Sequence, residues 1–198
     1  MTAGKFNIGT QQILLIENNA MMRRLVRDML VGFGVKLHHI VETDRVSDAL
    51  LHVYTKKFDL IITDFFLGDL DGGDLTRHIR GDERCPNRKV PILLITGAPN
   101  HEKVLKALES GVNEVLAKPI APSALYYRVF AILSKPRPFV ITSRYIGPSR
   151  SVQRLEGLAK LRQNRPTGER QWRSVQQAAV KYPKTEKQQP ATDKLLMT

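Results

Sequence analysis

The chain has 198 residues, a single cysteine (Cys85) and a formal net charge of +12. This length suits one ordinary domain with an extension, or two small domains, and it permits a hydrophobic core without covalent staples. One cysteine excludes an internal disulfide framework and a cysteine-based zinc site. The longest apolar runs are strand-sized and the N-terminus lacks an apolar signal-peptide core, so we expect a cytoplasmic protein without a membrane span.

The positive charge is unevenly distributed along the chain. Residues 1–135 contain 18 Lys and Arg against 15 Asp and Glu, a net charge of +3, whereas residues 136–198 contain 13 against 4, a net charge of +9. A strongly basic protein suggests nucleic-acid binding. Because most of the excess lies in the last third, that hypothesis concerns residues 136–198, and the first 135 residues need a separate explanation.

Strand and helix patterns alternate between residues 12 and 133. Short apolar runs predict strands at 13–16, 37–41, 60–63, 92–95 and 115–116. Apolar residues at helical spacing predict helices near 21–33, 46–53, 75–79, 104–108 and 122–133. The first, third and fourth strand runs do not alternate with polar residues, which is typical of parallel strands covered on both faces. The pattern predicts an α/β fold with a doubly wound, five-stranded parallel sheet.

The sequence changes character at Lys135. The run Lys135-Pro136-Arg137-Pro138 cannot continue a helix and is typical of a linker. Beyond Arg165 the chain is rich in Gln, Lys and Arg, which favours an irregular segment. We therefore expect an N-terminal arm at 1–10, a domain at 11–134 and a basic, flexible C-terminal extension at 135–198.

Polar residues stand at the ends of four predicted strands: Glu17 and Asn18, then Asp64, Thr96 and Lys118. The carboxyl ends of parallel strands meet at one edge of the sheet, so we expect these side chains to gather there. Carboxylates without His or Cys suit a hard cation such as Mg²⁺. An aspartate beside Mg²⁺ can attack a phosphoryl group and hold it as an acyl phosphate. A hydroxyl and an ammonium can then bond the phosphoryl oxygens.

Four motifs in chain order resemble those of the receiver domain of two-component response regulators. They lie at 15–19, 58–72, 91–97 and 111–119, within a resemblance that covers about 11–133. The resemblance implies a flavodoxin-like receiver with strand order 2-1-3-4-5, a stand-alone type that carries a basic C-terminal extension. It also implies a cis peptide bond between Lys118 and Pro119.

The resemblance implies a role for each residue at the sheet edge. Asp64 is the implied phosphoacceptor, and Thr96 and Lys118 are implied to stabilise the phosphorylated form. The implied Mg²⁺ ligands are Glu17, Asn18, Asp64 and the backbone carbonyl of Phe66. Two purely structural alternatives remain. Asp64 caps the helix that follows it, or the Asn18-Asn19 pair caps the first helix.

Two positions depart from the family pattern. Asn18 stands where the family has a second acidic residue, so we expect weaker Mg²⁺ binding. Val115 stands where the family has an aromatic switch residue, which questions the usual coupling to Thr96. These departures support an alternative, a degenerate receiver that acts as a phosphorylation-independent binding module.

The implied partners are a histidine kinase or a histidine phosphotransfer protein, and a downstream protein that reads the face of the fourth helix, fifth strand and fifth helix. A homodimer is also compatible with the sequence. The chain is expected to promote its own Mg²⁺-dependent phosphorylation without being an enzyme. Residues 145–150 resemble an aromatic-x-Gly-Pro-x-Arg extension that follows some bacterial receivers and could fold back on the domain. Alternatively, the extension binds nucleic acid through its Lys and Arg with Trp172 and Tyr182.

Overall fold

Five parallel strands form the central sheet in the order β2-β1-β3-β4-β5. The computed structural model describes residues 7–68, 70–97 and 101–150. Within these ranges the sheet strands are β1 Ile13–Ile16, β2 Ile40–Thr43, β3 Leu60–Asp64, β4 Ile92–Thr96 and β5 Glu114–Ala117. The strand order confirms the doubly wound parallel fold predicted from the sequence.

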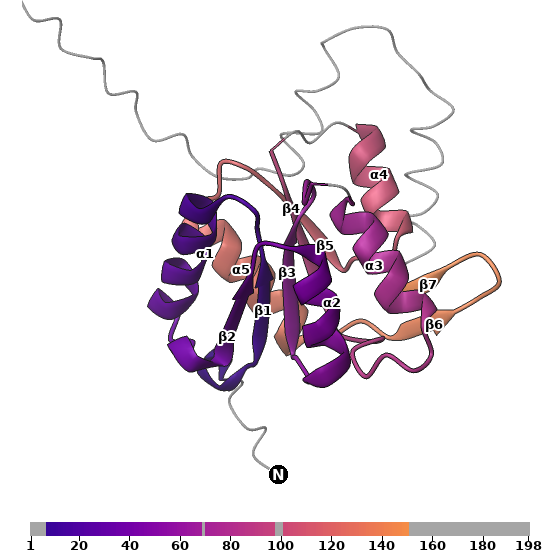
Figure 1. Cartoon of the computed structure of the whole chain (residues 1–198), viewed down its shortest axis with the longest axis horizontal. Helices are drawn as coiled ribbons and strands as arrows, with labels where there is room; N and C mark the ends of the chain where they lie inside the picture. The colour runs from indigo at the N-terminus through magenta and orange to yellow at the C-terminus, as the bar shows by residue number, and fades with distance from the viewer. Residues whose placement is uncertain (1–6, 69, 98–100, 151–198) are drawn as a thin grey trace, which may run out of the picture. The chain divides into compact units, whose positions relative to one another are not determined.

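Helices cover both faces of the sheet (Figure 1). They are α1 Ala20–Gly32, α2 Val46–Thr55, α3 Gly72–Gly81, α4 His101–Glu109 and α5 Pro122–Ser134. Buried residues of α1 and α5 belong to one core cluster, and buried residues of α2, α3 and α4 belong to the other. The three inner strands β1, β3 and β4 are therefore enclosed on two sides and fully buried, which explains why their apolar runs do not alternate with polar residues.

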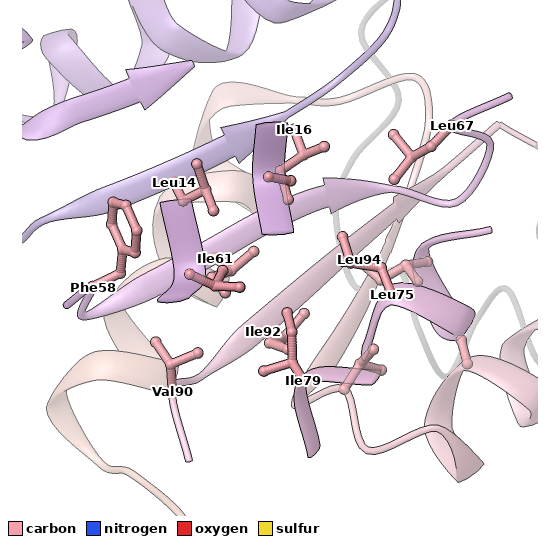
Figure 2. Close-up of a cluster of buried hydrophobic side chains, with 14 of the residues drawn as sticks. Leu14, Ile16, Phe58, Ile61, Leu67, Leu75, Ile79, Val90, Ile92 and Leu94 are labelled. Atoms are coloured by element: carbon pink, nitrogen blue, oxygen red, sulfur yellow. The ribbon is translucent and has the colours of Figure 1, made fainter. Parts of the chain in front are cut away.

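The strands divide their side chains between the two core clusters. Leu14 and Ile16 point to the side of α2, α3 and α4, which is the cluster shown in Figure 2. Ile13 and Leu15 point to the side of α1 and α5. Full burial of an aliphatic side chain of this size contributes about 1.5–3 kcal/mol, so packing in both clusters stabilises the strands that end at the site.

The second predicted strand begins too early along the chain. Residues Leu37–His39 form a short 3₁₀ helix, and β2 starts at Ile40. The start of β2 is set by its partner strand β1. Because β1 begins at Ile13 and Ile13 pairs with Ile40, the ladder between the two strands cannot begin before Ile40. The preceding residues have no strand to bond with, and His39 Nδ1 instead lies 3.2 Å from the Gly9 carbonyl oxygen.

Both predicted domain boundaries fall inside the compact unit that contains the sheet. That unit includes all of the described residues from 7 to 150. At its beginning, Ile8–Thr10 form a 3₁₀ helix and Ile8 joins the core, so the described part of the predicted arm packs on the domain. At its end, β6 (Phe139–Ile141) and β7 (Ile146–Pro148) form an antiparallel hairpin beyond Lys135.

Hydrogen bonds and cation–π contacts between this hairpin and the rest of the domain extend the fold beyond residue 134. Residues 151–198 lie outside the described residues, and so do the predicted irregular segment and the nucleic-acid hypothesis that rests on them. In the part of the chain that the structure describes, none of the helices has the length and apolar character needed to cross a membrane.

Candidate functional site

The polar residues singled out in the sequence lie at the carboxyl edge of the sheet. Asp64 is the last residue of β3 and Thr96 is the last residue of β4. Glu17 and Lys118 directly follow β1 and β5. Glu17, Asp64 and Thr96 retain only 2%, 6% and 1% of their exposure, which is unusual for such polar side chains. The polar residues at the ends of four neighbouring strands therefore lie together at one edge of the sheet, and most of them are buried.

Lys118 joins the two carboxylates. Its Nζ donates to Glu17 Oε2 at 2.8 Å and to Asp64 Oδ2 at 2.9 Å. Its backbone N–H donates to the Thr96 carbonyl oxygen at 2.8 Å, which fixes the lysine backbone against the end of β4. The cis bond between Lys118 and Pro119 that the resemblance implies is present. Three residues from separate strands thus form one charged cluster.

The lysine carries its charge at neutral pH. Burial by itself lowers the pKa of Lys118, but the hydrogen bonds to Glu17 and Asp64 outweigh it and raise that pKa above its ordinary value. One ammonium thus faces two carboxyl groups in this cluster. An oxygen-rich cluster that already contains a cationic donor can accept a divalent cation and can afterwards bond an anion.

Local backbone groups orient both carboxylates. Asp64 Oδ1 accepts a hydrogen bond from the Phe65 N–H at 2.6 Å, and Glu17 Oε1 accepts one from the Asn19 N–H at 3.1 Å. Gly72 permits α3 to start directly against this strand end, because a Cβ there would lie 2.3 Å from the Asp64 carbonyl oxygen. The turn after β3 therefore requires glycine at this position.

The remaining predicted ligands occupy the exposed flanks of the cluster. Asn18 follows Glu17 and is exposed, while its neighbour Asn19 caps α1 by accepting a hydrogen bond from the Met22 N–H at 2.9 Å. Phe66 retains 49% of its exposure and forms an isolated antiparallel bridge with Asp71. The structure thus brings Glu17, Asp64 and Lys118 into contact, and Thr96 and Asn18 adjoin them along the backbone.

The donor set at this edge suits Mg²⁺. Within residues 7–68, 70–97 and 101–150, His, Cys, Asp and Glu side chains do not gather in groups of three or more that could hold a metal. A cation here would therefore rest on the two carboxylates and on neutral oxygens. Each carboxylate oxygen has a further lone pair beyond the hydrogen bond it accepts. Mg²⁺ characteristically binds through one or two carboxylates and keeps several waters, which matches this set.

Sequence reasoning did not identify the contacts that α4 makes near the site. Lys106 Nζ lies 2.7 Å from Asp71 Oδ2, and Lys103 Nζ lies 4.7 Å from the centroid of the Phe66 ring. Both partners belong to the β3–α3 loop, which we define as the segment between Asp64 and Gly72. Lysines on an amphipathic helix look like an ordinary solvated face, so the sequence contained no signal for these contacts.

Comparison with curated proteins finds chemotaxis proteins of similar length to the domain. The chemotaxis protein CheY of Pseudomonas aeruginosa is 27% identical over 124 residues, which cover 63% of this chain and 97% of that protein. The chemotaxis protein CheY1 of Helicobacter pylori is 29% identical over 126 residues, which cover 62% of this chain and 96% of that protein.

Solved structures give the same result. A putative response regulator from Chloroflexus aurantiacus has a TM-score of 0.57 and 27% identity, and the match covers 63% of this chain and 98% of that one. The receiver domain of a sensor histidine kinase from Pseudomonas aeruginosa has a TM-score of 0.56 and 28% identity, with the same coverage. That structure is described with a magnesium ion coordinated in the active-site cleft.

A family model covers most of the described domain. It is the model of the response regulator receiver domain, and it matches residues 13–130, which end before the β6–β7 hairpin. Members of this family accept phosphoryl groups in two-component signalling and typically bind Mg²⁺ in their active site. The fold, the cluster of strand-end residues and this match together show that the chain belongs to the response regulator receiver domain family.

Proposed function

We propose that Asp64 accepts a phosphoryl group from a histidine kinase or a histidine phosphotransfer protein, and that the chain signals through a phosphorylation-dependent protein interaction. The observation that carries this proposal is the buried Asp64 carboxylate held 2.9 Å from Lys118 Nζ at the carboxyl edge of the sheet. Membership of the receiver family supports the same chemistry.

The proposed step is a displacement at phosphorus. A carboxylate oxygen of Asp64 attacks the phosphorus of a phosphohistidine, the P–N bond breaks, and its electron pair stays on the imidazole nitrogen, which takes up a proton. The product is an acyl phosphate on Asp64. The Lys118 ammonium, already hydrogen-bonded to this carboxylate, and the Thr96 hydroxyl at the end of the next strand bond the phosphoryl oxygens and offset their charge.

Glu17, Asn18, Asp64 and the Phe66 backbone carbonyl would hold Mg²⁺ beside this carboxylate. Bound Mg²⁺ supplies charge neutralisation for the transferring phosphoryl oxygens. Asn18 contributes a neutral oxygen where a carboxylate would add a full charge, which weakens the binding of the cation. In calorimetric titrations with MgCl₂, Asn18→Asp should therefore raise the affinity several-fold and Asp64→Asn should lower it. An unchanged affinity in both variants would exclude this site.

Labelling of the full chain by a small phosphodonor tests the phosphoacceptor directly. Wild type incubated with acetyl phosphate and MgCl₂ should gain the mass of one phosphoryl group, and chelation of Mg²⁺ should prevent the gain. Asp64→Asn should remain unmodified. Asp28→Asn, which changes an exposed carboxylate on α1, is the matched control and should be labelled like wild type. Equal labelling of Asp64→Asn, or no labelling of wild type, would refute the proposal.

The proposed output surface is the face of α4, β5 and α5, which either a downstream protein or a second copy of the chain could bind. Support comes from the backbone hydrogen bond between Lys118 and Thr96, which ties the start of the β5–α5 connection to the end of β4. A change at Thr96 can therefore reach this face. We propose no separate product for the protein beyond its own phosphorylation, and we place it with its kinase in the cytoplasm.

A phosphorylation-independent binding module is the second candidate. The observation that favours it is Val115, which lies half-buried in β5 and packs against the core cluster beneath α2, α3 and α4. A valine in this position has no polar end and no ring to exchange between a buried and an exposed rotamer. Signalling in cells decides between the two candidates, because an Asp64→Asn chain that still signals normally would establish the second.

A further inference from the structure

The β6–β7 hairpin is fastened to the C-terminal end of α4. Arg150 Nη2 donates to the carbonyl oxygens of Leu108 and Val112, each at 2.7 Å. The last carbonyls of a helix carry partial negative charge, and a guanidinium placed on them is stabilising. The end of the hairpin thus grips both the last turn of α4 and the residue that leads into β5.

Two glycines allow the hairpin to touch the α4–β5 turn directly. A Cβ on Gly147 would lie 2.8 Å from Gly111 Cα, and a Cβ on Gly111 would lie 2.5 Å from the Ile146 carbonyl oxygen. Gly111 also has a φ of 98°, in the left-handed region that glycine favours. Backbone meets backbone here without room for a side chain on either partner, which marks a specific interface.

Arg80 of α3 contacts both the α4–β5 turn and the hairpin. Its guanidinium is buried, with Nε donating to the Gly111 carbonyl oxygen at 3.2 Å and Nη2 donating to the Val90 carbonyl oxygen at 2.7 Å. The Phe139 ring of β6 lies over it, 5.3 Å from Cζ to the ring centroid. Burial lowers the pKa of Arg80 to about 10, which leaves it charged at neutral pH.

The side of α4 contacts the loop that begins at the proposed phosphoacceptor. Lys106 pairs with Asp71, and Asp71 Oδ1 also caps α3 by accepting the Asp74 N–H at 2.7 Å. Lys103 lies above the ring of Phe66, two residues after Asp64. One nine-residue helix therefore contacts the β3–α3 loop through its lysines and the hairpin through its last carbonyls.

We propose that α4 couples Asp64 to the β6–β7 hairpin, and that the hairpin is an output element of this receiver. This inference rests on the proposed phosphorylation of Asp64. A phosphoryl group rearranges the β3–α3 loop, the two lysine contacts pass the change to α4, and the helix moves as a rigid body. The Arg150 hydrogen bonds are near their optimal length, so a shift of about 1 Å at the helix end breaks them. The hairpin then loosens from the α4–β5 turn.

Hydrogen exchange of the full chain, read by mass spectrometry, tests the coupling. Beryllofluoride with MgCl₂ serves as the phosphoryl mimic. In wild type, amides of the β3–α3 loop should exchange more slowly, and amides of 139–150 should exchange roughly tenfold faster, as expected when a charge-assisted hydrogen bond is lost. Loop protection with an unchanged hairpin would overturn this inference and leave the proposed function standing. No response in either segment would overturn both.

Variants of α4 and of the hairpin test separately whether α4 transmits the change and whether the hairpin responds to it. The double variant Lys103→Met and Lys106→Met should keep the loop response to beryllofluoride and lose the hairpin response. Gly147→Ala should show fast exchange in 139–150 with or without the mimic, because its methyl group forces the hairpin off Gly111. Gly81→Ala, where nothing lies within 4 Å of the added Cβ, is the matched control and should behave as wild type. A hairpin response of wild-type size in the double lysine variant would refute α4 as the link.

Discussion

Replacing Lys118 with methionine should destabilise the domain by about 3 kcal/mol at neutral pH. The change keeps the length of the side chain and removes the ammonium that bonds Glu17 and Asp64 at 2.8 and 2.9 Å. Removal of one partner from a buried ion pair costs about 3–5 kcal/mol, because the remaining charge stays desolvated. The Lys118 side chain keeps 18% of its exposure, so some solvent reaches the pair and the lower end of that range applies.

Urea unfolding measures this effect, with Lys57→Met as the control for loss of an exposed lysine. The pKa of Lys118 is raised in the folded chain above its ordinary 10.5, so its contribution is complete below that value and is lost as the pH rises through the higher one. The difference between wild type and Lys118→Met should therefore stay constant from about pH 7 to 9 and narrow above about pH 10.5. A difference below about 1 kcal/mol at pH 7 would refute the assigned role of the lysine in the cluster.

Three further outcomes follow from packing and hydrogen bonding. Gly72→Ala should lower the free energy of unfolding by about 2 kcal/mol, because its Cβ would lie 2.3 Å from a carbonyl oxygen at the end of β3. Gly81→Ala, with open space around the added Cβ, should leave that free energy unchanged or slightly higher in the same urea series. Arg80→Leu should cost about 3 kcal/mol in urea unfolding, since buried carbonyls lose their charged donor, and a cost below about 1 kcal/mol would contradict this. The hydrogen bond from Tyr54 to Asp82 raises the pKa of the phenol to about 12, so its stabilisation holds below about pH 10 and is lost as the pH rises further. Absorbance titration of the phenolate should show Asp82→Asn returning this pKa toward its ordinary value, and an unaltered titration would disprove the assignment.

The central sheet could be predicted because burial leaves a direct trace in the sequence. The runs at 13–16 and 92–95 are apolar on both faces, and this occurs where helices cover a parallel strand on both sides. The predicted start of the second strand is wrong because the extent of β2 depends on its partner strand. Ile40 enters the ladder opposite Ile13, and no property of residues 37–39 themselves reveals that pairing.

The sequence also predicts that the site residues lie close together, since the carboxyl ends of parallel strands must meet at one edge of the sheet. Their individual partners could not be predicted, because the reach of Lys118 to two carboxylates depends on tertiary geometry. Arg80 shows the limit most clearly, as an arginine in the last turn of a helix normally indicates a solvated face. Here it is buried and bonded to backbone carbonyls, and a carbonyl is present at every position of any sequence.

The packing of the β6–β7 hairpin on the domain determines where the chain can be truncated without loss of contacts in the receiver. Similarity to the family ends at residue 130, whereas the contacts of Phe139 and Arg150 belong to the same compact unit as the sheet. A shortened chain that stops at Lys135 would strip the aromatic cover from Arg80 and leave the last carbonyls of α4 without their guanidinium. We therefore expect the shortest autonomous form of this receiver to extend through Arg150, and a fusion partner joined earlier to replace part of the domain rather than follow it.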